Sequence, residues 1–287
     1  MDNLFEGFET KFHDKDSQIK PFLKWAGGKF RLLEDIKSRL PQDRKRYIEP
    51  FMGGGSVTLN VDYPEMIVSD VNADLVNVYV SLRDLEEEFI GICEKIFNTK
   101  PNNKDTYYKF RDEFNATEDQ TKKAAIFIYL NKHCFNGLCR YNSKGSFNTP
   151  IGGIRTPKCP SAEMRKAIPK LKKIDFRISD FKNTLKLAGE GDLVYCDPPY
   201  LPISTKSFVQ YSKNGFTLDD QIELARLSEE AANRGAFILL SNHDTSYSRE
   251  LYKKYGASIS SISVRRSIGG ENAKRGEVPE LLASFEK

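Results

Sequence analysis

A four-residue segment, Asp197-Pro198-Pro199-Tyr200, combines residue types suited to holding a planar amino group. It follows the apolar run 193–196, which predicts a buried strand, so its side chains should stand at the carboxyl end of that strand. The two prolines fix φ and remove two donors, which leaves the Asp197 carboxylate and the Pro198 carbonyl as acceptors. An amine that donates both hydrogens to them is favoured in a pyramidal, more nucleophilic form, and Tyr200 offers a stacking face. A purely structural Asp-Pro-Pro turn is the alternative.

A glycine-rich segment at 47–56 predicts a strand, a tight turn and the start of a helix. Glycines such as Gly53 and Gly55 let the backbone approach a ligand closely and present amides at a helix N-terminus. The segment lacks the Gly-Lys-Ser/Thr of a phosphate-binding loop. A tight turn without a ligand has the same composition, so the segment indicates a cofactor site only in combination with other residues.

Asp70 directly follows the next apolar run, residues 66–69. An acidic residue at the end of the second strand of a nucleotide-binding α/β unit accepts hydrogen bonds from ribose hydroxyls. The alternative interpretation is that Asp70 caps a helix. His243, which follows a later apolar run, either lines the same cleft or is an ordinary loop histidine.

Short apolar runs alternate with longer helical patterns, which predicts an α/β fold with a Rossmann-like sheet. A long interruption between the second and third runs, helical to about residue 134 and then rich in Gly, Asn and Pro, predicts an inserted module. We therefore expect a loosely ordered lead-in at 1–19, a catalytic domain at 20–72 and 171–287, and an insert at 73–170. The predicted strands are 46–49, 66–69, 174–178, 193–196, 237–241 and 259–264.

The insert carries a concentration of positive charge that the chain as a whole does not. The net charge of the chain is +4, yet residues 132–173 contain ten Lys or Arg and a single acidic residue, Glu163. Such a patch neutralises phosphates, although a solvated basic face is the alternative. Phe135, Tyr141 and Phe147 lie among these cations and could stack on bases. Residues 135–141 and 146–150 predict two short strands joined at 142–145, and such a ribbon fits the DNA major groove.

Composition excludes several other classes of protein. No apolar run reaches the ~18 residues of a membrane span, and residues 1–20 lack the apolar stretch of a secretory signal. The five cysteines have no repeated CxxC spacing, and neither they nor His133 match a common zinc pattern. We expect a cytoplasmic enzyme with reduced thiols, no metal, no membrane association and no obligate protein partner.

Five segments in this order resemble the Dam family of DNA adenine methyltransferases, within the α group of amino-methyltransferases. They cover nearly everything after residue 20. The segments are Phe22-Leu-Lys-Trp-Ala-Gly-Gly-Lys29, Glu49-Pro-Phe-Met-Gly-Gly-Gly55, Asp70, Phe135-Asn-Gly-Leu-Cys-Arg-Tyr-Asn142 and Asp197-Pro-Pro-Tyr200.

The resemblance implies an S-adenosylmethionine (SAM) site and direct transfer of the methyl group to the N6 amine of adenine. Trp25, Lys29, Asp70 and Asp197 would contact SAM, together with the glycine turn at Gly53 and Gly55. Asp180 and Phe181 would lie beside its adenine ring. The segment 197–200 would receive a target adenine flipped out of double-stranded DNA, because the amine cannot be reached inside the base stack.

The resemblance also implies recognition of GATC. Lys24 would reach the outer guanine, Arg140 would read a guanine edge, and Leu138 and Pro150 would make apolar contacts. Phe135 would intercalate, with Asn136 helping to hold the gap, and Asn142 belongs to the same DNA-binding group. The sequence departs from the family at Gly153, where relatives often carry a basic residue; Arg155 is the nearest replacement.

Three other functions remain open at this point. Methylation of adenine in structured RNA or of a protein amide would use a similar acceptor loop, but neither explains a basic hairpin that bears aromatic residues. A DNA-binding regulator without activity is a third possibility. It predicts decay of the Asp-Pro-Pro-Tyr segment, which is intact at 197–200.

Overall fold

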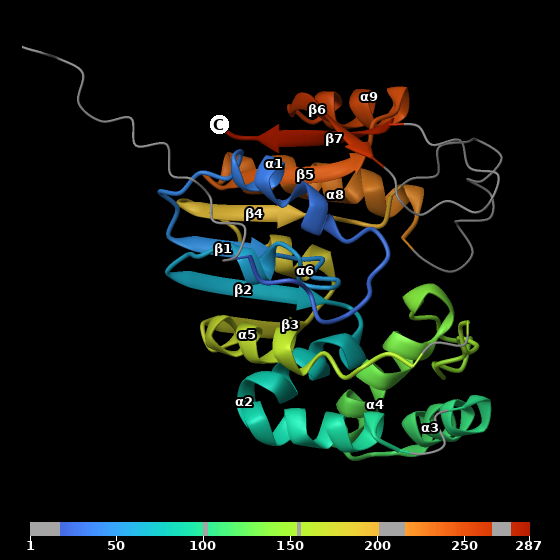
Figure 1. Ribbon diagram of the computed structural model, residues 1–287. Coiled ribbons are helices and arrows are strands. Elements are labelled where there is room, and N and C mark those ends of the chain that lie inside the picture. Colours follow the sequence, from blue (N-terminus) through green and yellow to red (C-terminus); the bar gives the residue numbers. More distant parts are fainter. Residues whose placement is uncertain (1–17, 100–102, 154–155, 201–215, 266–276) are drawn as a thin grey trace, which may run out of the picture.

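The centre of the protein is a seven-stranded sheet, seen in a computed structural model that describes residues 18–99, 103–153, 156–200, 216–265 and 277–287 (Figure 1). The strand order is β3-β2-β1-β4-β5-β7-β6. Strands β1 to β5 pair in parallel, whereas β7 is antiparallel to both of its neighbours. This is the predicted Rossmann-like sheet. The strands are β1 (Arg46–Glu49), β2 (Glu65–Asp70), β3 (Ile174–Ile178), β4 (Asp192–Cys196), β5 (Phe237–His243), β6 (Ser258–Arg265) and β7 (Glu277–Phe285).

All six predicted strands are present, and the sequence analysis missed β7. Its segment, Glu-Val-Pro-Glu-Leu-Leu-Ala-Ser-Phe, holds two glutamates and Pro279, which weaken the signal of an interior strand. Pairing with β5 and β6 on both sides nevertheless places β7 inside the sheet.

Helices cover both faces of the sheet (Figure 1). Side chains of successive strand residues alternate between the two layers: Tyr47 and Leu193 belong to one core, Ile48 and Val194 to the other. The first core also takes residues from α1, α2, α3, α4 and α5, and the second takes residues from α6, α8 and α9. The helices are α1 (Leu33–Lys37), α2 (Ala73–Phe97), α3 (Lys104–Ala116), α4 (Gln120–His133), α5 (Ser161–Leu171), α6 (Phe181–Leu185), α8 (Leu218–Asn233) and α9 (Ser246–Lys254).

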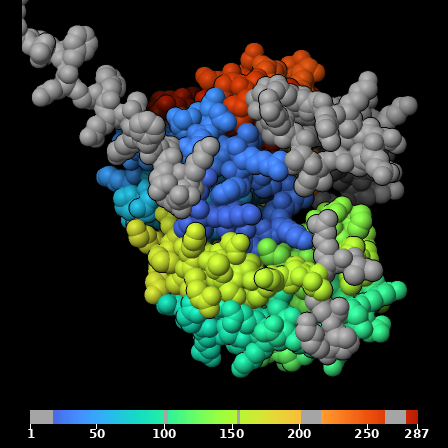
Figure 2. Space-filling model, in the orientation of Figure 1, coloured from blue at the N-terminus to red at the C-terminus, as the bar shows by residue number. Residues whose placement is uncertain are grey.

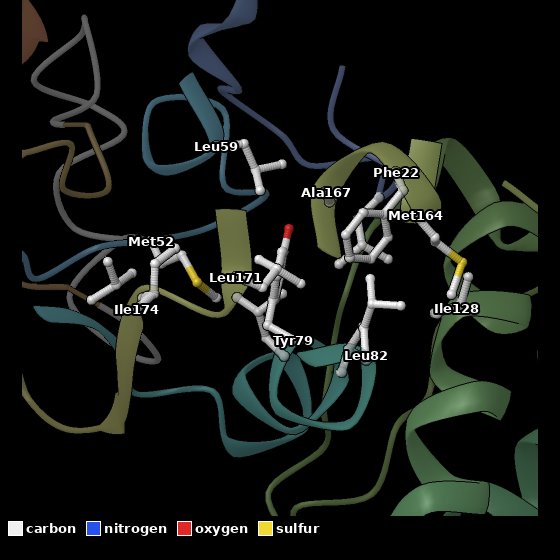
Figure 3. Packing of buried hydrophobic residues seen from close by; sticks show 14 of the residues in the cluster. Phe22, Met52, Leu59, Tyr79, Leu82, Ile128, Met164, Ala167, Leu171 and Ile174 are labelled. Atoms are coloured by element: carbon white, nitrogen blue, oxygen red, sulfur yellow. The ribbon is translucent and has the colours of Figure 1, made fainter. Parts of the chain in front are cut away.

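The predicted insert shares its core with the sheet. Phe22, from the segment before the sheet, lies 5.0 Å from the ring of Tyr79 on α2. Figure 3 shows these two residues packed together with side chains of α4, α5 and β3. The predicted boundary at residue 170 falls one residue before the end of α5. Insert and sheet are therefore joined by a continuous apolar layer.

Most of the predicted lead-in, 1–19, lies outside the described residues. Its last residue, Ile19, is fixed, because its amide donates to Asn60 Oδ1 at 2.8 Å and its carbonyl accepts from Asn60 Nδ2 at 2.9 Å. Among the helices of the described ranges, none has the length and apolar character needed to cross a membrane.

Candidate active site

A cavity of about 750 Å³ opens at the carboxyl ends of the parallel strands, beside the point where the chain order reverses between β1 and β4. Ligands of open α/β sheets bind at such a point. In Figure 2 the blue N-terminal residues lie between the orange C-terminal part and the green and yellow residues of α2 to α5. The cavity brings together the predicted residues Trp25, Lys29, Gly53, Asp70, Asp180, Phe181, Asp197, Pro198, Pro199 and Tyr200, and adds Glu49, Phe51, Val71, Tyr195, Phe216, Asp220 and His243, among others.

The glycine turn is shaped by the indole of Trp25. Gly53 has φ of 49°, and a Cβ atom there would stand 2.9 Å from Trp25 Cδ1. A Cβ on Gly54 would come within 2.8 Å of the Trp25 Cβ. Gly55, the other predicted glycine, has φ of 69° and packs against the Tyr79 hydroxyl, which donates to the Gly54 carbonyl at 2.9 Å. Glycine is required here both for the left-handed backbone and for the close approach of these rings.

Asp70 fixes this turn from the neighbouring strand. Its Oδ2 accepts from the amide of Gly53 at 3.1 Å, and its Oδ1 accepts from the amide of Asn72 at 2.9 Å. The cap of α2 is instead Asn72, whose side chain accepts from the amide of Leu75. The helix-cap interpretation of Asp70 is therefore wrong. Burial raises the pKa of the Asp70 carboxyl above its ordinary value, and the backbone amides of Asn72, Gly53 and Val71 oppose that rise.

Three aromatic rings form one wall of the cavity. Phe181 stacks on Phe51 with ring centroids 5.4 Å apart, and Phe216 meets both at 5.3 and 5.6 Å. Phe181 begins α6, and Asp180 caps this short helix by accepting from the amide of Lys182 at 2.8 Å. The wall offers an apolar surface beside a carboxylate, which suits a planar heterocycle with polar substituents.

The acceptor loop is held by contacts that the sequence analysis did not foresee. Lys29, only 4% exposed, places Nζ 2.9 Å from Asp197 Oδ1 and donates to the Gly27 carbonyl at 2.6 Å. The same ammonium lies 4.5 Å from the centre of the Tyr200 ring. Ser241, in β5, donates to Asp197 Oδ1 at 2.9 Å. Asp197 is thus anchored by a cation and a hydroxyl, and its side chain keeps 20% of its surface exposed.

The remainder of the loop is fixed from α8 and β7. The carbonyl of Pro199 accepts from Gln221 Nε2 at 2.8 Å, and the Tyr200 hydroxyl donates to Glu280 Oε2 at 2.9 Å. His243 does line the cleft, with its ring edge-on to Tyr200 at 4.7 Å. Gln221 is fully buried and joins a network with Asn242 and the Tyr252 hydroxyl. These contacts therefore fix the orientation of the Tyr200 ring.

Glu49 is a buried acid that the candidate residues did not include, although it begins the Glu-Pro-Phe-Met-Gly motif. Its carboxyl accepts from the Tyr47 hydroxyl at 2.7 Å and from the Thr58 hydroxyl. Burial raises the pKa of Glu49 to about 8, and the nearby charge of Asp197 adds to the effect. Its position at the end of an apolar strand, next to a glycine turn, was the signal available in the sequence.

The predicted hairpin is looser than two strands. Phe135–Gly137 is a turn of 3-10 helix, with φ of 53° at Asn136 and 70° at Gly137. Only two isolated antiparallel bridges follow within the described residues, Cys134 with Ile151 and Tyr141 with Phe147. The left-handed pair at 136–137 turns the chain out of an extended path, so residues 135–141 cannot form a continuous strand.

The candidate recognition residues of this hairpin are exposed. Phe135 is 50% exposed and Leu138 is 41% exposed, which are high values for such side chains. Arg140 is exposed and held by Asn148, to which its Nε donates at 2.8 Å. Asn136, Asn142 and Pro150 are also exposed, although Asn142 uses its side chain to accept from the amides of Lys144 and Ser146.

Two of the aromatic residues proposed for base stacking serve the interior instead. Phe147 is buried, and Tyr141 is half-buried against it with ring centroids 5.8 Å apart. The Tyr141 hydroxyl donates to Asp74 Oδ2 at 2.8 Å, which ties the hairpin to α2. Of the three rings, Phe135 alone stays available for bases.

Lys24 reaches the hairpin through Asn131, a fully buried residue of α4 that the sequence analysis missed. Asn131 Oδ1 accepts from the Lys24 amide and its Nδ2 donates to the Lys24 carbonyl, both at 2.8 Å. Lys24 Nζ donates to the Lys132 carbonyl at 2.9 Å. Burial lowers the pKa of Lys132 to about 8, and the charges of Lys24 and Lys20 contribute. Cations from two distant segments therefore converge beside the hairpin.

The second half of the basic stretch is locally neutralised. Lys170 and Lys173 both pair with Asp62, at 2.9 and 3.3 Å, and Arg165 pairs with Glu87 at 2.9 Å. Lys172 pairs with Glu86 at 2.6 Å. The solvated-face interpretation therefore holds for residues 165–173, and phosphate binding applies best to the half that contains Arg140. Arg155, the suggested replacement for a basic residue at 153, lies outside the described residues.

Within the described ranges no three His, Cys, Asp or Glu side chains gather as a metal site. All five cysteines are free thiols. His133 stacks on Tyr129 at 3.9 Å and shares a hydrogen bond with its carbonyl, which gives this histidine a role in packing.

Comparisons with known proteins identify one family model and several similar proteins. A family model described as D12 class N6 adenine-specific DNA methyltransferase matches residues 25–268. The DNA adenine methylase of Vibrio cholerae is 41% identical over 268 residues, covering 93% of this chain and 96% of that protein. That of Escherichia coli K12 is 40% identical over 267 residues, covering 93% and 95%. Among solved structures, a precorrin-6y methyltransferase from Geobacter metallireducens is 9% identical, with a TM-score of 0.38 over 90% of this chain and 88% of that one.

Proposed function

Because the chain belongs to the D12 class of N6 adenine-specific DNA methyltransferases, we propose that it methylates an adenine flipped out of duplex GATC sites, with SAM as the donor. One observation carries the proposal. A single cavity joins the glycine turn, Asp70 and the aromatic wall to the Asp197–Tyr200 acceptor loop. A methyl donor and an acceptor amine can therefore lie side by side in it, as direct transfer requires.

The residues present fit SAM. The glycine turn brings backbone against the cavity, the Asp70 carboxylate can accept from ribose hydroxyls, and Phe181 with Phe51 can hold the adenine ring. When bound, SAM supplies an electrophilic methyl group on sulfonium. The indole of Trp25 lies against Gly53 and Gly54. We therefore assign Trp25 to shaping the glycine turn, and not to holding the adenine ring of SAM.

The chain's own contribution to the reaction is to orient the amine. Asp197 and the Pro198 carbonyl accept hydrogen bonds from the two N–H groups of the amine, which favours a pyramidal nitrogen. Tyr200 stacks on the base. On accepting the methyl group that SAM would supply, the amine nitrogen would become cationic until it loses one proton to solvent. The Asp197 carboxylate stabilises that developing charge, and preorganised charges of this kind are a main source of catalysis.

The test is methyl transfer from radiolabelled SAM to matched substrates: a GATC duplex, a duplex with N6-methyladenine at both target positions, duplexes altered by one base pair, and an RNA hairpin. We expect label only on duplexes with an unmodified target adenine and an intact site. Equal labelling of altered duplexes would overturn the GATC assignment, and preferential labelling of RNA would overturn the duplex assignment.

We assign recognition to the insert, 73–170, together with Lys24. The exposed Phe135 and Leu138 supply apolar wedges, while Arg140 and Lys24 supply donors for guanine edges. Support comes from the exposure of Phe135, Leu138 and Arg140 and from the contact of Asn131 with Lys24.

For Arg140→Ala we expect a loss of about 1–3 kcal/mol of discrimination at one base pair, because a bidentate guanine contact would be lost. Methylation rates are compared between the GATC duplex and duplexes altered one base pair at a time. In the variant, the rate on the duplex altered at one outer guanine-containing pair, the pair opposite the one that Lys24 reads, should approach the rate on the GATC duplex. The control is Arg165→Ala, which removes a cation paired with Glu87 and should leave the rates unchanged. Equal slowing on every duplex would reassign Arg140 to a phosphate.

For Asp70→Ala we expect SAM binding to weaken by about 2 kcal/mol, because a hydrogen bond to a charged group is lost. Titration calorimetry measures the affinity. Asn72→Ala is the matched control: it removes the cap of α2 but leaves the Asp70 carboxylate in place, so it should lower stability without changing SAM affinity. Unchanged affinity in Asp70→Ala would limit the role of Asp70 to fixing the turn.

A further inference from the structure

Two donors converge on one oxygen of Asp197. Ser241 Oγ and Lys29 Nζ each lie 2.9 Å from Oδ1. Across the described ranges, every hydrogen bond and ion pair found for this carboxylate is made through Oδ1. A carboxylate oxygen has two lone-pair sites, so two donors saturate it. We infer that Ser241 is a positioning residue which, with Lys29, occupies Oδ1 and thereby directs Oδ2 to the amine of the target adenine.

The position of Ser241 follows from strand register. β4 and β5 pair in parallel with Cys196 opposite Leu240. The next residue on each strand is therefore at the same level, which puts Ser241 beside Asp197 at the carboxyl edge of the sheet. Ser241 is fully buried, so bulk water does not compete for its hydroxyl hydrogen. The charged Asp197 Oδ1, at 2.9 Å, is a closer and stronger acceptor than the Cys196 carbonyl at 3.4 Å.

A second hydroxyl supports the first. The Tyr195 hydroxyl lies 3.4 Å from Ser241 Oγ, and because the Ser241 hydrogen goes to Asp197, Tyr195 is the donor of this pair. Burial raises the pKa of Tyr195 well above its ordinary value, which keeps the phenol protonated and able to donate. The result is a chain from Tyr195 through Ser241 to Asp197, in which each hydrogen bond polarises the next.

This arrangement has a catalytic consequence. A carboxylate held through one oxygen cannot rotate freely about its Cβ–Cγ bond, so Oδ2 keeps its direction towards the base. Without Ser241 the carboxylate is held by Lys29 alone, and one donor restricts rotation of the carboxylate less than two. Loss of the Ser241 hydroxyl therefore disturbs the orientation of the amine in the transition state. We expect it to lower kcat and to leave substrate binding unchanged.

The experiment compares three single variants. Ser241→Ala should lower kcat on the order of tenfold, the equivalent of one hydrogen bond to a charged group, with KM unchanged for SAM and duplex. Tyr195→Phe should lower kcat by about twofold to threefold, because it acts through Ser241. Ser228→Ala is the control: Ser228 is equally buried but donates to the Leu224 carbonyl within α8, so its loss should leave kcat at the wild-type value.

The inference rests on the proposed role of Asp197, and the outcomes separate the two. If Asp197→Ala is inactive while Ser241→Ala matches Ser228→Ala, the positioning role is overturned and the proposed function stands. A rise in KM for SAM with unchanged kcat in Ser241→Ala would also overturn it, by making Ser241 a part of the cofactor site. Activity retained in Asp197→Ala would overturn both.

Discussion

Replacing Asp197 with alanine is expected to lower kcat by about a thousandfold or more, the scale seen when a preorganised partner of a developing charge is removed. The residue is the anionic acceptor of the loop, and the parallel strands place it in the same cavity as the glycine turn. Single-turnover methyl transfer on a GATC duplex measures the effect. Duplex affinity should survive, because the hairpin surface does not include Asp197.

The alanine variant also leaves a nearly buried ammonium without its partner, since Lys29 is 4% exposed and pairs with Asp197. Removing one member of such a pair costs about 3–5 kcal/mol, so unfolding must be measured alongside turnover. Asp197→Asn is the matched control, because it keeps an oxygen acceptor at the same place and should retain part of the activity. Turnover near the wild-type value in Asp197→Ala would remove the residue from the chemistry.

Replacing Asn131 with alanine is expected to destabilise the protein by about 2–4 kcal/mol, because a buried amide is lost and both backbone groups of Lys24 lose their partner. Asn131 is fully buried, and its side chain makes hydrogen bonds of 2.8 Å with both the amide and the carbonyl of Lys24. Urea unfolding measures the loss. Discrimination at the guanine proposed for Lys24 should fall in parallel, because the backbone that carries this lysine is released from the hairpin.

Asn115 provides a control with the same pattern of hydrogen bonds. Its Oδ1 accepts from the Phe147 amide at 2.8 Å and its Nδ2 donates to the Phe147 carbonyl at 3.1 Å, but the residue is exposed. Water can replace these bonds, so Asn115→Ala should cost about 1 kcal/mol or less. Equal losses in the two variants would show that burial of Asn131 contributes nothing to its effect.

The sequence by itself determined the features that depend on local pattern. Runs with the length and apolar content of strands identified β1 to β6. The signal is strongest in β4 and β5, which are buried on both faces and therefore have nearly unbroken apolar segments. The residues that follow those runs, Asp70 and Asp197, were candidates for the same reason: parallel strands bring their carboxyl ends to one edge of the sheet. Both line the cavity.

Only the tertiary structure decided which side chains meet across long separations in the chain. Ser241 reaches Asp197 through the register of β4 with β5, and Asn131 reaches Lys24 across 107 residues. β7 has too polar a sequence to be predicted and exists because two neighbours pair with it. The charges at 165–173 looked like a phosphate surface until folding set Asp62 and α2 beside them. In each case the interaction energy depends on the distance between two segments, and that distance is set by packing of the whole chain.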